Sequence, residues 1–265
     1  MAFRHQTATR ASLIALFFLH SLSLAADLRV TVRLKRVGRD QLGQLLVHDQ
    51  GLSFQPSERK QSSKSRNRRG ANLRSDWPYS EIQQLWVSAD KLVLLTYKDR
   101  KWRLGSDQGY TFFATADRAG GPDFRLVYEK LKNRSTPRLV VALADPPSRP
   151  LWSSRVKLQG LLEGSEGELM MGEDRIVYQT DRQHQARTWR FEDLENVFQS
   201  DRYHLTLVSW ERAWLQYESR RAFNFQLKEP LEESRFQTLW RKVQVVHGLE
   251  MFRFDAAGQV SPAAR

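Results

Sequence analysis

The residues of this chain best suited to chemistry are the arginines and lysines of one short segment. Within residues 57–75, seven cations stand among Ser, Gln, Asn and Gly, and Glu58 is the one acid. They are Arg59, Lys60, Lys64, Arg66, Arg68, Arg69 and Arg74. Clustered cations attract polyanions and release their counterions, and a guanidinium group binds phosphate through two parallel hydrogen bonds. A membrane surface adds roughly 1 kcal/mol per nearby Lys or Arg. The segment therefore predicts contact with an anionic surface, either lipid headgroups or another polyanion.

The composition of this basic segment also leaves a second interpretation open. A run so polar cannot pack against a core, and charged loops commonly do no more than keep a protein soluble. No aromatic residue lies inside the run, so it has no side chain on which single-stranded bases would stack. We therefore predict no specific nucleic-acid partner, and a solvated loop without a ligand remains the alternative.

The charge of the whole chain is concentrated in the same half as this segment. The 265 residues carry 42 Lys and Arg against 30 Asp and Glu, a net charge of +12. Residues 27–148 hold 23 basic and 13 acidic side chains, whereas residues 149–265 hold 17 of each. An anionic partner is thus expected to meet the first half of the protein, while the second half suits a neutral packing or protein-binding role.

A search for catalytic and metal-binding patterns returns nothing specific. The histidines of residues 27–265 are His48, His184, His204 and His247, and no two have the close spacing of a metal site. The chain has no cysteine, which excludes disulfides and thiolate ligands. Nucleophile-elbow, P-loop and dinucleotide-binding patterns are absent. We predict a non-enzymatic protein without cofactor or metal; a hydrolase whose residues come from distant positions stays open.

The first 26 residues read as an export signal. Arg4 and Arg10 precede a mostly apolar stretch from Ala11 to Leu24, no acid occurs before Asp27, and the small residues Ser23 and Ala25 suit a cleavage site. The apolar stretch is short for a membrane span. The sequence therefore predicts an exported, periplasmic or extracellular protein, with an uncleaved membrane anchor as the alternative.

Sliding the chain along itself reveals an internal repeat. Residues 43–55 align with residues 167–179 at an offset of 124, beginning with Gly43 aligned to Gly167. From Trp77 onward the offset is 112, so the first copy contains about twelve extra residues, which coincide with the basic segment. Aromatic and apolar positions agree at this second offset. The aligned pairs are Trp77 with Trp189, Tyr79 with Phe191, Ile82 with Leu194, Leu85 with Val197, Phe113 with Phe225, Phe124 with Phe236 and Tyr128 with Trp240.

Each copy changes its hydrophobic period near its end. Short runs of alternating or β-branched residues separated by turn residues predict several strands. Apolar residues spaced i, i+3, i+4, i+7 then predict one helix that buries a single face. The two stripes are Phe124, Val127, Tyr128 and Leu131, and Phe236, Leu239, Trp240 and Val243. The predicted organisation is a signal peptide (1–26), a first domain (27–145) with the insertion 57–75, a Pro-rich linker (146–152), a second domain (153–254) and a flexible tail (255–265).

This order resembles the pleckstrin-homology superfold, in particular the bacterial PH-like and GRAM-type domains. The residues that carry the likeness are Gly43-x-Leu-x-Val followed by Leu52-x-Phe54, then Trp77-x-Tyr79 and the Phe124 helix, with their counterparts in the second copy. The resemblance implies a mainly β protein with α-helix, built as two tandem PH-like bent barrels, each closed by a C-terminal amphipathic helix. It also implies that loops at the open end bind anionic headgroups.

If the resemblance holds, Lys35, Arg36 and Arg39 border the loop between the first two strands, and the basic segment lies in the loop between the third and fourth. The second copy has Glu163, Glu166 and Glu168 at the first of these loops, and Arg182, His184 and Arg187 at the other. We therefore expect an exported binding protein whose first domain contacts an anionic surface. A structural adaptor that binds peptides at strand edges, with an incidental basic loop, is the alternative.

Overall fold

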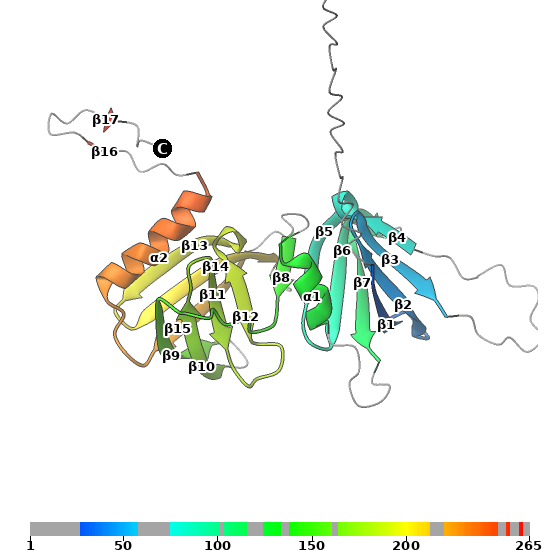
Figure 1. Cartoon of the computed structure of the whole chain (residues 1–265), viewed down its shortest axis with the longest axis horizontal. Coiled ribbons are helices and arrows are strands. Elements are labelled where there is room, and N and C mark those ends of the chain that lie inside the picture. Colours follow the sequence, from blue (N-terminus) through cyan, green and yellow to red (C-terminus); the bar gives the residue numbers. More distant parts are fainter. Residues whose placement is uncertain are drawn as a thin grey trace, which may run out of the picture.

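The computed structural model of this protein is mainly β with two α-helices in the described part of the chain, as expected from the sequence. It describes residues 27–57, 75–100, 103–115, 124–133, 138–160, 164–212, 220–248, 253–254 and 260–261. The strands gather in two lobes that stand side by side, with helix α1 and strand β8 between them (Figure 1).

The first lobe runs from strand β1 to strand β8. Its elements are β1 (Leu28–Leu34), β2 (Gln41–His48), β3 (Gly51–Pro56), β4 (Ser75–Pro78), the 3-10 turn η1 (Tyr79–Glu81), β5 (Ile82–Val87), β6 (Lys91–Arg100), β7 (Arg103–Ala114), helix α1 (Arg125–Leu131) and β8 (Arg138–Val141).

The second lobe repeats this order without a counterpart of β8. Its elements are β9 (Trp152–Gln159), β10 (Ser165–Met171), β11 (Arg175–Gln179), β12 (Arg187–Arg190), the 3-10 turn η2 (Phe191–Asp193), β13 (Leu194–Asp201), β14 (His204–Arg212), β15 (Arg220–Leu227) and helix α2 (Glu233–Val246). A small hairpin of β16 (Arg253–Phe254) and β17 (Val260–Ser261) follows.

The two expected closed barrels are not formed, and this part of the prediction is wrong. Fifteen strands make one continuous sheet, in the order β13-β14-β15-β9-β10-β11-β12-β8-β5-β6-β7-β1-β2-β3-β4. In each lobe, two strands that follow each other in sequence are separated in this order, β4 from β5 and β12 from β13. Only a 3-10 turn joins the two strands of each pair, η1 between β4 and β5 and η2 between β12 and β13. Each part of the sheet must therefore curl until these two strands come close together. The turn occupies the position where a hydrogen-bonded ladder would close a barrel.

Strand β8 lies in the middle of this sheet and was not predicted. It pairs in parallel with β5 along its whole length and meets β12 of the second lobe at one residue pair, Val141 with Thr188. The parallel partner needs a long crossover, which β6, β7 and helix α1 provide. The region before the prolines therefore contributes to the sheet that joins the lobes, whereas the sequence suggested only the end of a domain.

The described residues bury two separate apolar clusters, one in each lobe. The repeated glycine explains how the aromatic ring of the third strand fits in each. A Cβ atom on Gly43 would lie 2.5 Å from the ring of Phe54 and 2.4 Å from the carbonyl oxygen of Gln55. A Cβ atom on Gly167 would lie 2.8 Å from the ring of Tyr178. Glycine therefore recurs in the repeat because the neighbouring strand brings an aromatic ring over that position.

Gly43→Ala is expected to lower the free energy of unfolding by about 1–3 kcal/mol, because the added methyl group overlaps backbone and ring atoms that cannot both move away. Chemical denaturation measures this loss. Gly109→Ala is the matched control, since its Cβ would have no neighbour closer than 3.7 Å. Equal stability of the two variants would contradict this explanation of the repeated glycine.

The structure also corrects the alignment of the two copies at their seventh strands. Phe112 is buried, whereas Phe113, the residue matched to Phe225 in the sequence, is partly exposed. The ring of Phe112 lies 5.8 Å from that of Phe54, and the ring of Phe225 lies 5.1 Å from that of Tyr178, the counterpart of Phe54. Phe112 is therefore the equivalent of Phe225. Because side chains alternate along a strand, the one-residue error had placed the ring on the wrong face.

The two predicted helical stripes face the cores, with one correction. Phe124, Val127, Tyr128 and Leu131 are all buried. In α2, Leu239 and Val243 are buried, but Trp240 and Phe236 are only partly covered. Helix α2 packs on β13 and η2 at one margin of the curled sheet. The middle of its inner face is therefore buried, whereas the two sides of that face are partly exposed to solvent. Trp240 is thus a flank residue, not the core residue expected.

Three predictions fall outside the described residues. They are the signal peptide 1–26, the cations Arg59 to Arg74 and nearly all of the tail 255–265.

Candidate functional site

A tight turn between β1 and β2 holds three of the predicted cations. Lys35, Arg36 and Arg39 are exposed, and Gly38 takes the positive φ of 90° that reverses the chain. The backbone N–H of Arg36 donates to the Asp40 carboxylate at 3.4 Å. The turn thus presents its basic side chains to solvent at one end of the first lobe.

The described part of the chain stops at Ser57, just before the basic segment, and this end of β3 lies beside the β1–β2 turn. Strand β2 pairs with β1 at Gln41 opposite Leu34 and with β3 at Gly43 opposite Pro56. The Ser57 N–H donates to the Leu42 carbonyl at 3.0 Å. In Figure 1 the arrowhead of β3 likewise lies at the end of the lobe where β2 begins. The end of β3 and the β1–β2 turn therefore lie at the same end of the lobe, although Arg59, Lys60, Lys64, Arg66, Arg68, Arg69 and Arg74 themselves lie outside the described residues.

The acid of this turn, Asp40, does not pair with the cations of the turn. Asp40, the acid nearest in sequence, pairs with Arg33 at 3.4 Å. Within the described ranges, no acidic side chain forms an ion pair with Lys35, Arg36 or Arg39. Three exposed cations without an ion-pair partner among the described residues make this end of the first lobe a candidate site for an anionic ligand.

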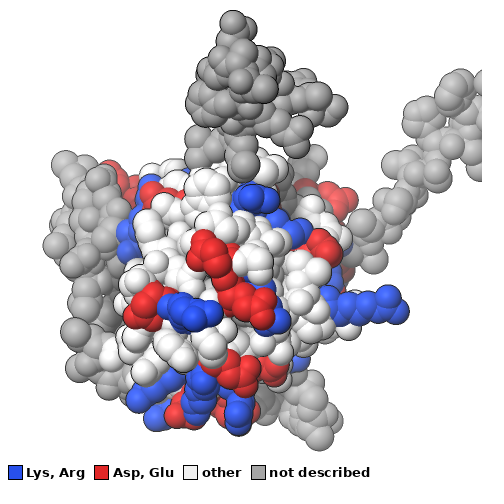
Figure 2. Space-filling view, turned by 90° about the vertical axis from the view of Figure 1, so that its left-hand side faces the viewer, with Lys and Arg blue, Asp and Glu red and all other residues white. Residues whose placement is uncertain are grey.

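The corresponding hairpin of the second lobe has the opposite character. Glu166 and Glu168 are exposed there, and Glu163 lies outside the described residues. Glu166 accepts a bond from Lys228 at 2.5 Å, and this bond lowers the pKa of the Glu166 carboxyl. On the face of the second lobe that Figure 2 shows, acidic and basic side chains are interspersed. This face offers no cluster of one sign.

The loop between β11 and β12 corresponds in order to the basic segment, but it packs against the first lobe. The His184 ring lies 3.5 Å from the Asp90 carboxylate and 5.9 Å from the ring of Trp86. The Gln183 amide also donates to Asp90, at 3.3 Å. The second lobe therefore uses this loop for contact between the lobes.

Arg187 is buried at the start of β12, although the sequence placed it in that loop. It is 3% exposed, and Glu211 is 5% exposed. The guanidinium donates to Glu211 at 3.3 Å, and Arg221 donates to the same carboxylate at 2.6 Å. Burial lowers the pKa of Arg187 while Glu211 opposes this effect. Of the three side chains predicted for this loop, Arg182, His184 and Arg187, Arg182 alone is exposed.

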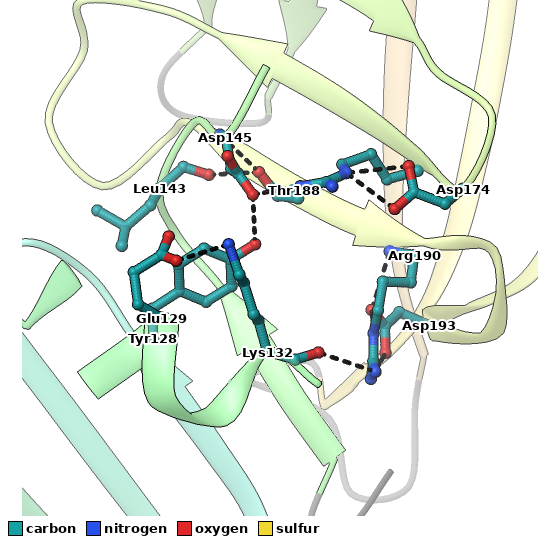
Figure 3. A network of polar contacts seen from close by, with 10 residues as sticks. Tyr128, Glu129, Lys132, Leu143, Asp145, Asp174, Thr188, Arg190 and Asp193 are labelled. Atoms are coloured by element: carbon teal, nitrogen blue, oxygen red, sulfur yellow. Dashed lines mark hydrogen bonds and ion pairs between the residues drawn. The ribbon is translucent and has the colours of Figure 1, made fainter. Parts of the chain in front are cut away.

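A second polar network crosses the seam between the lobes (Figure 3). The Tyr128 hydroxyl of α1 donates to Asp145 at 2.8 Å, and Arg175 of β11 pairs with the same carboxylate. Burial and this bond raise the pKa of Tyr128. Thr188 joins the two segments further, since its hydroxyl donates to the Leu143 carbonyl at 2.8 Å and accepts from the Asp145 N–H at 3.0 Å. Asp145 is thus fixed by both lobes.

Sequence reasoning missed this seam. Asp145 was assigned to a domain boundary, and Arg175 to an ordinary strand. Asp145 lies beside the prolines, but its partner Thr188 lies 43 residues further along the chain. Neither residue has a neighbour in sequence that would identify the pair.

The described residues contain no group of three or more His, Asp or Glu side chains arranged to hold a metal ion. None of the helices described is long and apolar enough to cross a membrane.

Comparisons with known proteins provide no family. No family model and no curated protein matches the chain. Among solved structures, it is similar to the C-terminal domain of an unknown protein from Leishmania infantum, at 7% identity and a TM-score of 0.28, over 45% of this chain and 94% of that one. It is also similar to the Spt16D Pob3N heterodimer, at 10% identity and a TM-score of 0.27, over 70% of this chain and 84% of that one.

Proposed function

We propose that this protein is an exported, non-enzymatic binding protein whose first lobe contacts an anionic surface. The contact would be made by the β1–β2 turn together with the basic segment 59–74. The single observation that carries the proposal is the exposed turn, whose Lys35, Arg36 and Arg39 have no ion-pair partner among the described residues and stand where that segment begins.

The two lobes would be PH-like units with different tasks. The repeated order of seven strands and a helix supports this assignment. The insertion in the first copy would provide the anion-binding loop. The second copy, with balanced charges and a loop packed on Asp90 and Trp86, would position the first.

Vesicle sedimentation tests the proposed contact. The purified protein is expected to sediment with vesicles rich in anionic lipid and to remain in solution with neutral ones. Binding should weaken strongly between about 10 mM and about 150 mM salt, where the Debye length falls from roughly 30 Å to roughly 8 Å. Exchanging Arg66, Arg68 and Arg69 for Ser should remove about 3 kcal/mol of binding free energy, at roughly 1 kcal/mol per cation.

A matched control separates local contact from net charge. Arg155, Arg182 and Arg241 are exposed on the second lobe, and their joint replacement by Ser removes the same charge. This control should bind nearly as well as the unaltered protein. Equal loss in both triple variants, or binding that persists in high salt, would refute a local electrostatic contact. Binding of heparin with the same dependence on residues 66–69, but not of vesicles, would identify a polyanion other than lipid.

A further inference from the structure

The ladder that joins the two lobes is a single residue pair long, and it leaves a gap in the sheet at the seam. Strands β8 and β12 pair at Val141 and Thr188, and the ladder ends there. The next antiparallel pair would join Leu139 to Arg190. The Arg190 N–H instead donates to the Asp193 carboxylate of η2 at 2.9 Å. Because Asp193 takes this donor, β12 diverges from β8 after one residue pair.

The outer edge of β8 faces this gap. The Ala142 N–H donates to the Val87 carbonyl of β5 at 2.7 Å. In a parallel pair, the main-chain groups of alternate residues point to opposite neighbours, so those of Leu139 and Val141 point away from β5. Val141 meets Thr188, which leaves Leu139 as the position where β8 could accept another strand.

A cavity of about 270 Å³ opens between the diverging strands. Its walls include Arg138 to Val141 of β8, Thr188 to Arg190 of β12, Trp210 of β14 and His247. This volume is just below the usual range for small-ligand pockets, roughly 300–1,000 Å³. It therefore suits a few residues of extended chain better than a folded surface.

An acidic occupant would meet Arg138, the one lining arginine without an ion-pair partner among the described residues; the other lining arginine, Arg190, and the three lining acids Glu192, Asp193 and Glu211 are paired. Glu192 and Asp193 pair with Arg190 at 2.6 and 3.2 Å, and Glu211 pairs with Arg187 and Arg221. Arg138 is exposed, its guanidinium lies 5.3 Å from the centre of the Trp210 ring, and the guanidinium of Arg220 lies 4.3 Å from the same centre. No acid in the described part of the chain forms an ion pair with Arg138.

We propose that this gap binds an extended acidic peptide segment of a partner protein. The main chain of the peptide pairs with β8 at Leu139, one of its carboxylates contacts Arg138, and an apolar side chain packs on Trp210. The chain's own C-terminal residues 249–265 suit the gap less well, because their two acids are balanced by two arginines.

A display library of random ten-residue peptides, selected on the purified protein and counter-selected on Arg138→Glu, tests the proposal. We expect enrichment of peptides that alternate apolar and acidic residues. In fluorescence anisotropy, a selected peptide should bind Arg138→Glu and Trp210→Ala at least about tenfold more weakly. Arg149→Glu, at another exposed arginine, should bind like the unaltered protein.

Methylated peptides test the strand pairing without altering the protein. Two versions of the selected peptide carry N-methyl groups on alternate residues, at odd or at even positions. One should lose binding at least about tenfold while the other retains it, since only one edge of the peptide faces β8. Absence of enrichment, or equal loss with both versions, would overturn the proposal. Peptide binding that appears only after removal of residues 249–265 would also overturn it, since the occupant would then be the chain's own C-terminal segment.

Discussion

Trp189→Ala is expected to lower the free energy of unfolding by about 3–5 kcal/mol, as large aromatic truncations in protein cores do. The side chain is 3% exposed, and its ring meets those of Phe223 and Phe225 edge-on, with centroids 4.8 and 6.4 Å away. Alanine would lose these contacts and leave a cavity that the paired strands around it cannot close. Urea denaturation monitored by circular dichroism measures the loss.

Trp240→Ala provides the comparison for this substitution. The same side chain is removed, but Trp240 is partly exposed on the flank of α2. Its truncation should therefore cost clearly less than that of Trp189. A loss at Trp240 equal to or greater than the loss at Trp189 would contradict the packing described for the second lobe.

Glu211→Ala is the second substitution with a large expected effect, a loss of about 3–5 kcal/mol in the free energy of unfolding. Glu211 receives hydrogen bonds from Arg187 and Arg221. Without this carboxylate, Arg187 would stay charged and buried with no acid beside it, because a guanidinium does not give up its proton in proteins. Chemical denaturation of the variant gives the value.

Two controls show whether the loss comes from the unpaired charge. The double variant Arg187→Met with Glu211→Leu should be more stable than Glu211→Ala alone, since it buries neither charge. Lys228→Ala, which breaks the exposed pair with Glu166, should change stability by less than about 1 kcal/mol. If Glu211→Ala also cost less than about 1 kcal/mol, the buried pair would not have the structural role assigned to it.

The sequence was sufficient to predict the elements that local periodicity specifies. Alternating apolar residues and turn residues predicted several short strands in each copy, and the i, i+3, i+4, i+7 stripes located both helices. The repeat was visible because Gly43, Phe54 and Trp77 occupy positions where few other side chains fit, as the contact between Gly43 and Phe54 shows. Local rules failed at the seventh strand, where a one-residue offset between Phe112 and Phe113 exchanges the two faces.

The amino-acid composition likewise located the positive charge of the candidate site, because seven cations close together in the sequence can be recognised without knowing the fold. The exposure of Lys35, Arg36 and Arg39 agrees with their place in a turn. Their lack of a described counterion could not be read from the sequence, since Asp40 lies one residue from Arg39 and yet pairs with Arg33.

The tertiary structure alone decided how the two copies meet. Strand β8 is four residues long and lies in an apolar run, Leu139 to Leu143, that does not alternate, so local periodicity does not show which strands it joins; it pairs with β5 and β12. Arg187 looked like a loop cation because its partner, Glu211, is 24 residues away. Asp145 and Thr188 meet across 43 residues. Periodicity reports contacts within one element, whereas the seam, its buried charges and its gap depend on contacts between residues that are distant in sequence.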